Sequence, residues 1–483
     1  MTKKHSKIPS PFDPEDFRKE GHKLVDRLSD YLTDALSGNE MPVLPWKDPD
    51  LLAEQFSFRS AGGDSEPLDD FIKRIIDNSI HIHHPHYIGH QVTSPLPVTA
   101  LVQFCTTLLN NGAAIYEMGP VNMAMEKNVV KKFGALIGYK EGYDGIFTHG
   151  GTAGNLTAML AARQVKTNYN IWEDGIRENE RPGYLISEQA HYSVGRNVKI
   201  MGLGEESIVK VPVDSKFRMR TDLLEEIKLS AEKKGLRIIS VVASSCSTAT
   251  GTYDELEKIA DFCEKYDLWM HVDGAHGMGV LFSDKYKHRI RGIERADSVV
   301  IDFHKMLLVP ALNSLVMFRN GERSYETFAQ KASYLFQKSQ KNLWYNSAVR
   351  TIECTKSALG IVAYSAMKYY GENYYSTYID ERYDLTAAFA RVVRLNKHLQ
   401  LATEPESNII CFRYISENKD DMTLNQINSA IRDRIIKEGS FYIVQVELEG
   451  KIWIRLTIIN PVTSIEDLKS LLKRIMELGK SLC

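Results

Sequence analysis

The chain has 483 residues, a formal net charge of −2 and six scattered cysteines without a CxxC pair. This length is enough for two or three structural units with a sizeable buried core. The nearly neutral charge gives no electrostatic basis for binding nucleic acid or an anionic membrane, and no apolar run approaches the ~18 residues that span a bilayer. The cysteines predict reduced thiols in a cytoplasmic protein, and not a disulfide framework or a zinc site.

The N-terminal segment, residues 1–90, is expected to be helical. Asp13, Pro14 and the two acids that follow them are typical of a helix start. An apolar stripe at helical spacing comes next, at Phe17, Leu24, Leu28, Tyr31, Leu32 and Leu36. Such a stripe could face the core or a partner chain, and the pattern alone favours the core.

Five histidines lie close together at the end of this segment, at His81, His83, His84, His86 and His90. Their density raises the question of a metal site. A metal needs ligands that converge in space, however, and no cysteine or acidic cluster lies nearby to complete a set. We therefore expect no metal.

The middle of the chain, residues 91–369, alternates short apolar strands with amphipathic helices. Strands are expected at 145–148, 183–187, 208–213, 237–243, 268–272, 298–301 and 313–318, and helices at, for example, 154–167, 221–234 and 254–266. This alternation predicts an α/β fold with a mostly parallel sheet between two layers of helices.

The last part, residues 370–483, has a different pattern. A long helix is expected at 373–398 and a strand at 408–414, followed by a helix at 424–438, strands at 441–447 and 452–459, and a helix at 464–478. This order predicts a small C-terminal α+β domain with an antiparallel sheet.

Two of the expected strands are followed by residues suited to one cofactor. Asp273 follows the strand at 268–272, and Lys305, preceded by His304, follows the strand at 298–301. Ligands of open α/β sheets bind at the carboxyl ends of strands. A lysine there can form a Schiff base with pyridoxal phosphate, while an aspartate pairs with its pyridine nitrogen. A surface lysine and a turn-capping aspartate are the alternative interpretation.

A glycine-rich turn at 148–156 joins a strand to a helix. Glycines let the backbone approach an anion, and the start of a helix offers free N–H groups. The spacing differs from a Walker loop and from a dinucleotide-binding fingerprint, which argues against a nucleotide. The turn is a candidate phosphate site, although a tight connection without a ligand would look similar.

Asp-Gly-Ala-His-Gly at 273–277 and Asp-Phe-His-Lys-Met at 302–306 resemble the group II pyridoxal-phosphate-dependent amino acid decarboxylases. This family includes the glutamate, cysteine sulfinate, aromatic amino acid, histidine and diaminobutyrate decarboxylases. Matching segments run from about Pro85 to Pro461. The resemblance implies the large domain of fold-type I pyridoxal-phosphate enzymes, and an N-terminal helical segment that packs across a homodimer interface.

The resemblance also implies roles for residues around the cofactor. Lys305 would carry the cofactor, and Asp273 would keep its pyridine nitrogen protonated. His191, in Ser-x-x-Ala-His-x-Ser, would stack on one face of the ring and orient the leaving carboxylate, with Ala275 on the other face. The remaining cofactor-binding candidates are Gly151 and Thr152 in the phosphate cup, His304 near the phosphate, and Thr248 at the cofactor edge or on Asp273.

Three further residues are implied at the substrate end. Tyr87 and His90 follow a His-Pro-aromatic segment at the mouth of the site. Arg455, in a closing Arg-x-x-x-x-Asn-Pro, would bind a substrate carboxylate through its planar donors, although an arginine on a strand could also extend to solvent. Segments around Tyr116 and Tyr345 resemble the glutamate and cysteine sulfinate branch.

The stretch 334–345 resembles a mobile loop that closes over the partner's site and carries a proton-donating tyrosine. Lys341 stands near the place of that tyrosine, and one residue is missing from the loop. Tyr345 is the candidate donor if the loop folds differently. Alternatively, Trp344 and Tyr345 pack beneath the loop.

These residues lead us to expect α-decarboxylation of an L-amino acid to its amine and carbon dioxide. The expected cofactor is pyridoxal 5'-phosphate, and the expected assembly is a cytoplasmic homodimer with shared active sites that binds neither nucleic acid nor membrane. Oxidative deamination to an aldehyde and transamination are alternatives on the same scaffold. A non-catalytic protein that kept the fold is a third.

Overall fold

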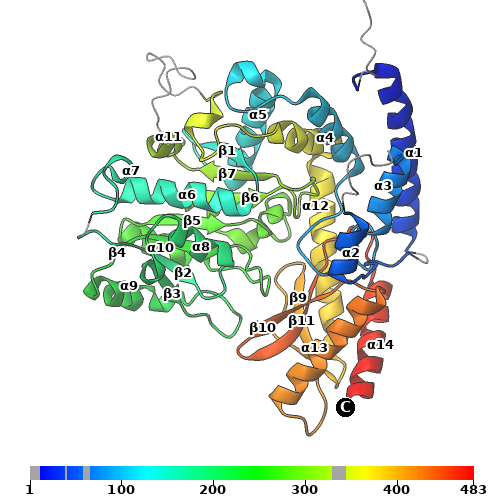
Figure 1. Ribbon diagram of the computed structural model, residues 1–483. Coiled ribbons are helices and arrows are strands. Elements are labelled where there is room, and N and C mark those ends of the chain that lie inside the picture. Colours follow the sequence, from blue (N-terminus) through cyan, green and yellow to red (C-terminus); the bar gives the residue numbers. More distant parts are fainter. Residues whose placement is uncertain (1–10, 39–40, 58–65, 178, 329–343) are drawn as a thin grey trace, which may run out of the picture.

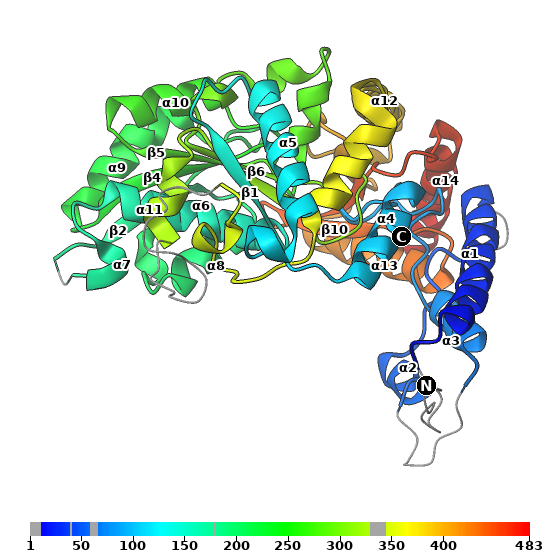
Figure 2. The same ribbon diagram turned by 90° about the horizontal axis from the view of Figure 1, so that it is seen from above.

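The computed structural model describes residues 11–38, 41–57, 66–177, 179–328 and 344–483 (Figure 1). The N-terminal segment contains α1 (Pro14–Ser37), α2 (Pro49–Gln55) and α3 (Leu68–Asp77). Asp13 caps α1 as expected, since its carboxylate accepts the backbone N–H of Glu15 at 2.8 Å. These helices stand beside the rest of the molecule and do not cover its sheet (Figure 2).

The large unit is built on a seven-stranded sheet in the order β1-β7-β6-β5-β4-β2-β3. The strands are β1 (Asp144–Thr148), β2 (Pro182–Ser187), β3 (Ile208–Val211), β4 (Arg237–Ser244), β5 (Trp269–Asp273), β6 (Ser298–Asp302) and β7 (Ser314–Phe318). All pairs are parallel except those of β7, which runs antiparallel to β1 and β6. The expected α/β class and mostly parallel sheet are confirmed.

Helices cover both faces of this sheet, which is why its central strands β4, β5 and β6 are buried along almost their whole length. The helices are α4 (Pro97–Leu109), α5 (Pro120–Ile137), α6 (Gly151–Lys166), α7 (Ile171–Asp174), α8 (Tyr192–Ile200), α9 (Leu224–Lys233), α10 (Leu256–Lys265) and α11 (Glu322–Phe328). Phe133 of α5 and Ile259 of α10 belong to the core on one face, and Ala158 of α6 and Val194 of α8 belong to the core on the other.

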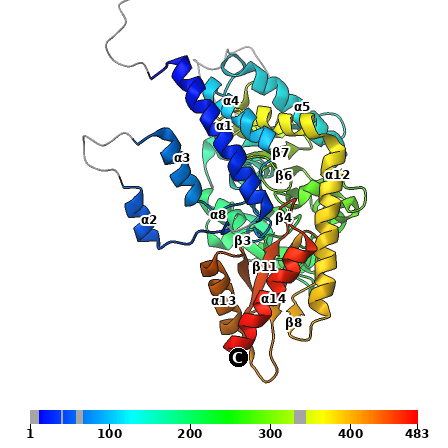
Figure 3. The same cartoon turned by 90° about the vertical axis from the view of Figure 1, so that its right-hand side faces the viewer.

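A long helix, α12 (Leu359–Arg394), runs from the large unit to the C-terminal one (Figure 3). Its start lies 14 residues before the expected position at 373. Gly371, at φ 71°, interrupts the helix and explains the difference, because the sequence pattern changes at this break. The helix crosses the expected boundary at residue 370, and the division into residues 1–90, 91–369 and 370–483 stays a prediction.

The C-terminal unit has a four-stranded antiparallel sheet in the order β10-β11-β9-β8. Its elements are β8 (Leu399–Leu401), β9 (Ile409–Tyr414), α13 (Asp421–Glu438), β10 (Val444–Leu448), β11 (Lys451–Thr457) and α14 (Ile465–Leu482). The expected α+β arrangement is present, and the short strand β8 was not foreseen. No helix in the described part of the chain is both long and apolar enough to cross a membrane.

Candidate active site

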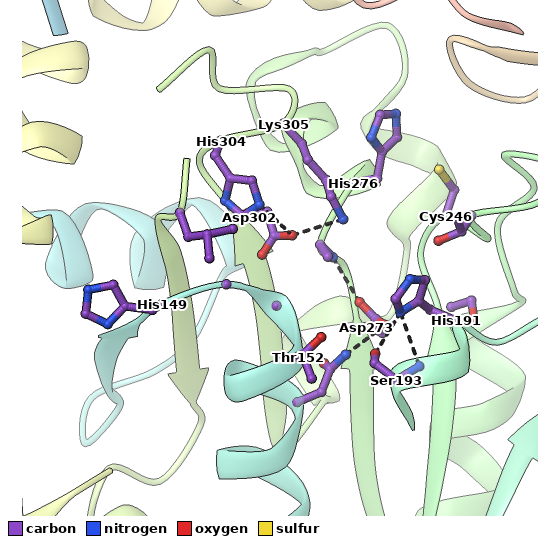
Figure 4. A pocket seen from close by; sticks show the side chains of 17 residues that line it. His149, Thr152, His191, Ser193, Cys246, Asp273, His276, Asp302, His304 and Lys305 are labelled. Carbon is purple, nitrogen blue, oxygen red and sulfur yellow. Dashed lines mark hydrogen bonds and ion pairs between the residues drawn. The ribbon is translucent and has the colours of Figure 1, made fainter. Parts of the chain in front are cut away.

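A cavity of about 270 Å³ lies where β4, β5 and β6 end and α6 begins. Eight of the expected site residues line it: Gly151, Thr152, His191, Thr248, Asp273, Ala275, His304 and Lys305. They come from segments more than 150 residues apart in the sequence, and Figure 4 shows several of them converging on one space. The position at the carboxyl ends of the strands is the one expected for a ligand site in an α/β sheet.

Lys305 reaches the cavity from the segment after β6. Its Nζ lies 3.0 Å from Oδ2 of Asp302, the last residue of that strand. Burial by itself would lower the pKa of Lys305, but the carboxylates of Asp302 and Asp273 outweigh it and raise that pKa. Lys305 is therefore held as an ammonium ion by the two buried acids.

Asp273, at the end of β5, is the acceptor at the end of a buried hydrogen-bond chain. Its Oδ2 accepts from Asn155 Nδ2 at 2.9 Å, and its Oδ1 accepts from the backbone N–H of Ala275 at 3.2 Å. Asn155 Oδ1 lies 3.0 Å from His271 Nε2. Burial lowers the pKa of His271 to about 4, so its ring is neutral and can donate to Asn155. Two N–H donors therefore hold the carboxylate of Asp273 in place at the cavity.

His191 is the N-cap residue of α8, and its Nδ1 lies 2.7 Å from Ser193 Oγ. Burial lowers the pKa of His191, which keeps the ring neutral although Asp273 is near. In Figure 4 the ring lies beside Asp273 and on the same side of the cavity. A neutral, oriented imidazole in this place offers a flat surface against which an aromatic ligand can stack.

The first turn of α6 faces the same cavity. Gly150, at φ 93°, turns the chain into the helix, and Gly151 and Thr152 begin it. A Cβ atom on Gly151 would come within 3.0 Å of both carboxylate oxygens of Asp302, so the backbone is as close to β6 as a glycine allows. The free N–H groups of this turn can bind an anion. Nearby, His304 Nδ1 contacts the backbone of Asn313 at 2.9 Å and 3.1 Å.

Comparison with known proteins gives the family. Residues 55–415 match the model of the pyridoxal-dependent decarboxylase conserved domain. The chain is 31% identical to the acidic amino acid decarboxylase GADL1 of Homo sapiens over 97% of this chain and 91% of that protein. It is also 28% identical to the aromatic-L-amino-acid decarboxylase of Bacillus atrophaeus, over 96% of each chain. The crystal structure of mouse CSAD superposes with a TM-score of 0.88 at 26% identity, covering 97% of this chain and 99% of that one.

The chain belongs to the pyridoxal-dependent decarboxylase family. It is a pyridoxal-phosphate-dependent enzyme that removes the α-carboxyl group of an amino acid. The cavity fits this cofactor on three independent features. A buried amine is available at Lys305 for its aldehyde, a carboxylate at Asp273 for its pyridine nitrogen, and a helix start at Gly151 for its phosphate.

Four expected residues of this decarboxylase do not line the cavity of their own chain. Tyr87 stacks on Tyr442 with ring centres 5.3 Å apart, and His90 tilts against the same ring at 5.6 Å. Tyr345 contacts the rings of Tyr116 and Trp344, each at 5.5 Å. Most of the loop expected to carry Tyr345 lies outside the described residues, so both the catalytic role of Tyr345 and its packing beneath the loop stay predictions. Lys341 lies outside the described residues.

Arg455, the fourth of these residues, is buried on β11 behind the cavity wall. Its Nε donates to the carbonyl of Thr248 at 2.9 Å and of Ala249 at 3.2 Å, and its Nη1 donates to the carbonyl of Gly89 at 3.3 Å. Its Nη2 is buried and has no hydrogen-bond partner among the described residues. Nε and Nη1 are thus engaged by backbone carbonyls and Arg455 does not line the cavity, so its role at the substrate stays a prediction.

Several lining residues were not identified from the sequence. Asn155 takes the place that the sequence suggested for Thr248 as the side-chain partner of Asp273, while the carbonyl of Thr248 accepts from Arg455. The position of Asn155, one turn into the helix after the glycine-rich segment, was the available signal. Asp302 was visible in the motif at 302–306, but nothing in the sequence showed that it faces Lys305. In the described residues no group of three metal-ligating side chains comes together.

Proposed function

We propose that decarboxylation takes place in this cavity, with Lys305 as the attachment point of the cofactor, Asp273 as the partner of its pyridine nitrogen and His191 against its ring. The observation that carries the proposal is the convergence of these three side chains on one cavity beside the free N–H groups of α6. When bound, the cofactor supplies a reactive carbonyl carbon and a ring that accepts the electrons left by the departing carboxylate.

In this proposal each of the other side chains of the cavity contacts a different part of the cofactor. Asp273, which accepts hydrogen bonds from Asn155 and from the N–H of Ala275, holds a proton on the pyridine nitrogen. Gly151 and Thr152 bind the phosphate with backbone donors, and His304 lies next to them. His191 packs on one ring face and Ala275 on the other, which fixes the plane across which the carboxylate must leave. Thr248 lies at the edge of the cofactor.

For the substrate we propose an L-amino acid with an acidic side chain. The relative GADL1 is named an acidic amino acid decarboxylase, and another relative is a cysteine sulfinic acid decarboxylase from Mus musculus, 30% identical over 91% of this chain. The unpaired Nη2 of Arg455, buried beside the backbone of Thr248, is a candidate donor for the acidic group of such a substrate. Tyr87 and His90 would border the same end.

The substrate proposal is tested by measuring carbon dioxide release from a panel of acidic, aromatic and diamino acids. We expect turnover with L-aspartate, L-glutamate or cysteine sulfinate, and a higher KM for that substrate in Arg455→Lys, since an ammonium cannot reproduce the planar donors of arginine. Turnover of aromatic or diamino acids alone would contradict the acidic assignment. An unchanged KM in Arg455→Lys would remove Arg455 from it.

We further propose a cytoplasmic homodimer with shared active sites. Two helices on one side of the molecule leave apolar side chains in solvent, namely Phe17, Val25, Leu28 and Leu36 of α1 and Leu101, Phe104, Leu108 and Leu109 of α4. Phe17 and Phe104 stack with ring centres 6.0 Å apart, so the two sets join into one apolar surface. A surface of this kind is typical of a permanent contact with a second copy. All six cysteines are free, as expected in a reducing compartment.

A further inference from the structure

The proposed decarboxylation leaves one buried charge at the site without a role. Asp302 ends β6, and its side chain is only 2% exposed although it lines the cavity. A buried carboxylate is costly unless it is paired and hydrogen-bonded. The partners of Asp302 therefore indicate what it does.

Each oxygen of Asp302 has a defined partner. Oδ2 lies 3.0 Å from Lys305 Nζ and 3.6 Å from His304 Nε2, and Oδ1 accepts from Ser314 Oγ at 2.5 Å. Burial would raise the pKa of Asp302, but the charges of Lys305 and His304 together with the hydroxyl of Ser314 lower it below its ordinary value. Asp302 is therefore ionised, and its closest cation is the amine that must react.

This contact opposes the attachment reaction. An amine adds to an aldehyde only as the free base, whereas a neighbouring carboxylate favours the ammonium form. Other titratable groups line the cavity around Lys305. They are Asp273 at the end of β5, Cys246 after β4, His149 after β1, His191 at the start of α8, His276 after β5, and His304 beside Lys305 itself. Of these, Asp273 also raises the pKa of Lys305, as Asp302 does. The carboxylate of Asp273, however, already accepts hydrogen bonds from Asn155 and from the N–H of Ala275.

We propose that Asp302 is the counter-ion that holds Lys305 as an ammonium before the cofactor arrives, so that loss of this ion pair controls how fast the cofactor is captured. The inference rests on the proposed function in taking Lys305 as the attachment point. In the capture step the ammonium first gives one proton to a base in solution. The free amine then adds to the aldehyde carbon, and the aldehyde oxygen leaves as water with the two remaining amine protons as the carbon–nitrogen double bond forms. Asp302 is a positioning residue that acts through Lys305.

The test follows covalent capture and not turnover. Protein stripped of its cofactor is mixed with pyridoxal phosphate, and the growth of visible absorbance is timed from pH 6 to pH 10 for the wild type, Asp302→Asn and Ser314→Ala. We expect the wild-type rate to rise with pH, and the Asp302→Asn profile to move about 1–3 pH units lower, the size of a close charge-pair effect. At a fixed pH below this rise, capture by the variant is then at least about tenfold faster. Ser314→Ala removes the neighbouring hydroxyl but keeps the charge, so its profile stays with the wild type.

A second aldehyde and a second variant complete the experiment. Pyridoxal, which lacks the phosphate, must show the same shift, and a shift confined to pyridoxal phosphate would overturn the proposal by showing that Asp302 repels the phosphate instead. If Asp302→Asn does not fold, Asp302→Ser removes the same charge and carries the same expectation. An unshifted profile in a protein that still captures the cofactor at Lys305 overturns the role of Asp302 alone. Failure of the wild type to capture it at Lys305 overturns the proposed function as well.

Discussion

Asp273 is held in place by a hydrogen-bond chain that begins at residues outside the cavity lining. Trp269 Nε1 donates to Ser298 Oγ at 2.8 Å, and Ser298 Oγ lies 2.9 Å from His271 Nδ1. From His271 the bonds continue through Asn155 to Asp273. Since the buried His271 is neutral, every donor in this chain can point toward the carboxylate.

We expect Asp273→Asn to lower kcat about 100-fold, or about 3 kcal/mol, while the cofactor still binds. The amide cannot balance a positive charge on the pyridine nitrogen, so the ring accepts electrons poorly. The measurement is kcat with a saturating amino acid substrate. Asp267→Asn is the matched control just before the start of the same strand, where the carboxylate is 94% exposed. Activity of Asp273→Asn equal to that of the control would contradict the assignment.

A second residue-scale prediction concerns acid stability and His84. Burial, followed by the charges of His86 and His81, lowers the pKa of His84 from its ordinary 6.5 to about 4. Between these values the unfolded chain binds a proton that the folded chain does not. Stability is therefore complete above pH 6.5 and falls as the pH drops toward 4, by about 2 kcal/mol at pH 5.

Urea unfolding at pH 7 and pH 5 measures this loss. His84→Asn keeps an acceptor for the backbone N–H of His86, which His84 Nδ1 binds at 3.0 Å, but it cannot be protonated. The variant is expected to lose about 2 kcal/mol less than the wild type between the two pH values. Equal losses in the two proteins would show that His84 does not titrate in this range.

At the scale of elements, the strands were the predictable part. Each central strand is an apolar run bounded by polar residues, and all seven expected strands of the large unit lie within two residues of their observed bounds. The side chains at their ends were harder to foresee. Lys305 and Asp273 stand out by residue type, whereas the contact of Asp302 with Lys305 depends on how the chain turns after β6. The packing of Tyr87 on Tyr442 joins segments 355 positions apart, which no local pattern reports.

A further prediction concerns Tyr345, the candidate proton donor, which follows α11 in the chain. In its own chain this ring packs on Tyr116 and Trp344, so a catalytic role requires it to reach another site. If it donates the proton that completes the amine, Tyr345→Phe should shift the product from amine toward aldehyde, with oxygen uptake and release of ammonia. The measurement follows these four species together. Clean amine from both proteins without oxygen consumption would exclude Tyr345 as the donor.

At the scale of the whole molecule, the N-terminal helix α1 keeps several large apolar side chains exposed to solvent. α1 leaves Phe17, Leu28 and Leu36 at least 40% exposed, whereas Leu24, Tyr31 and Leu32 of the same stripe are partly buried, so only part of the stripe faces the chain's own core. Burying such a surface against a second copy would remove apolar area from water at about 25 cal/mol per Å². A single sequence cannot distinguish a helix that packs on its own core from one that packs on a partner, because both carry the same stripe.

Leu108→Glu is expected to weaken the dimer. Leu108 is 64% exposed on α4, and a charge there would be buried without a partner in the proposed interface. Sedimentation velocity should find mostly dimer for the wild type and a monomer at the same concentration for the variant, and the proposed sharing of sites predicts a loss of activity with it. Leu229→Glu, at a 47% exposed position on α9, is the control and should remain a dimer. A dimeric Leu108→Glu would place the interface elsewhere.

The central claim is that Lys305 carries the cofactor, and one measurement tests it directly. The protein is incubated with pyridoxal phosphate and reduced with borohydride, and the labelled peptide is identified by mass spectrometry. Lys356 is an internal comparison, because it too is a buried lysine but bonds to Glu126 and to the carbonyl of Phe147, away from the cavity. The account predicts a label on Lys305, absent in Lys305→Ala. A label on Lys356 or another lysine, or an unchanged absorbance spectrum in Lys305→Ala, would contradict it.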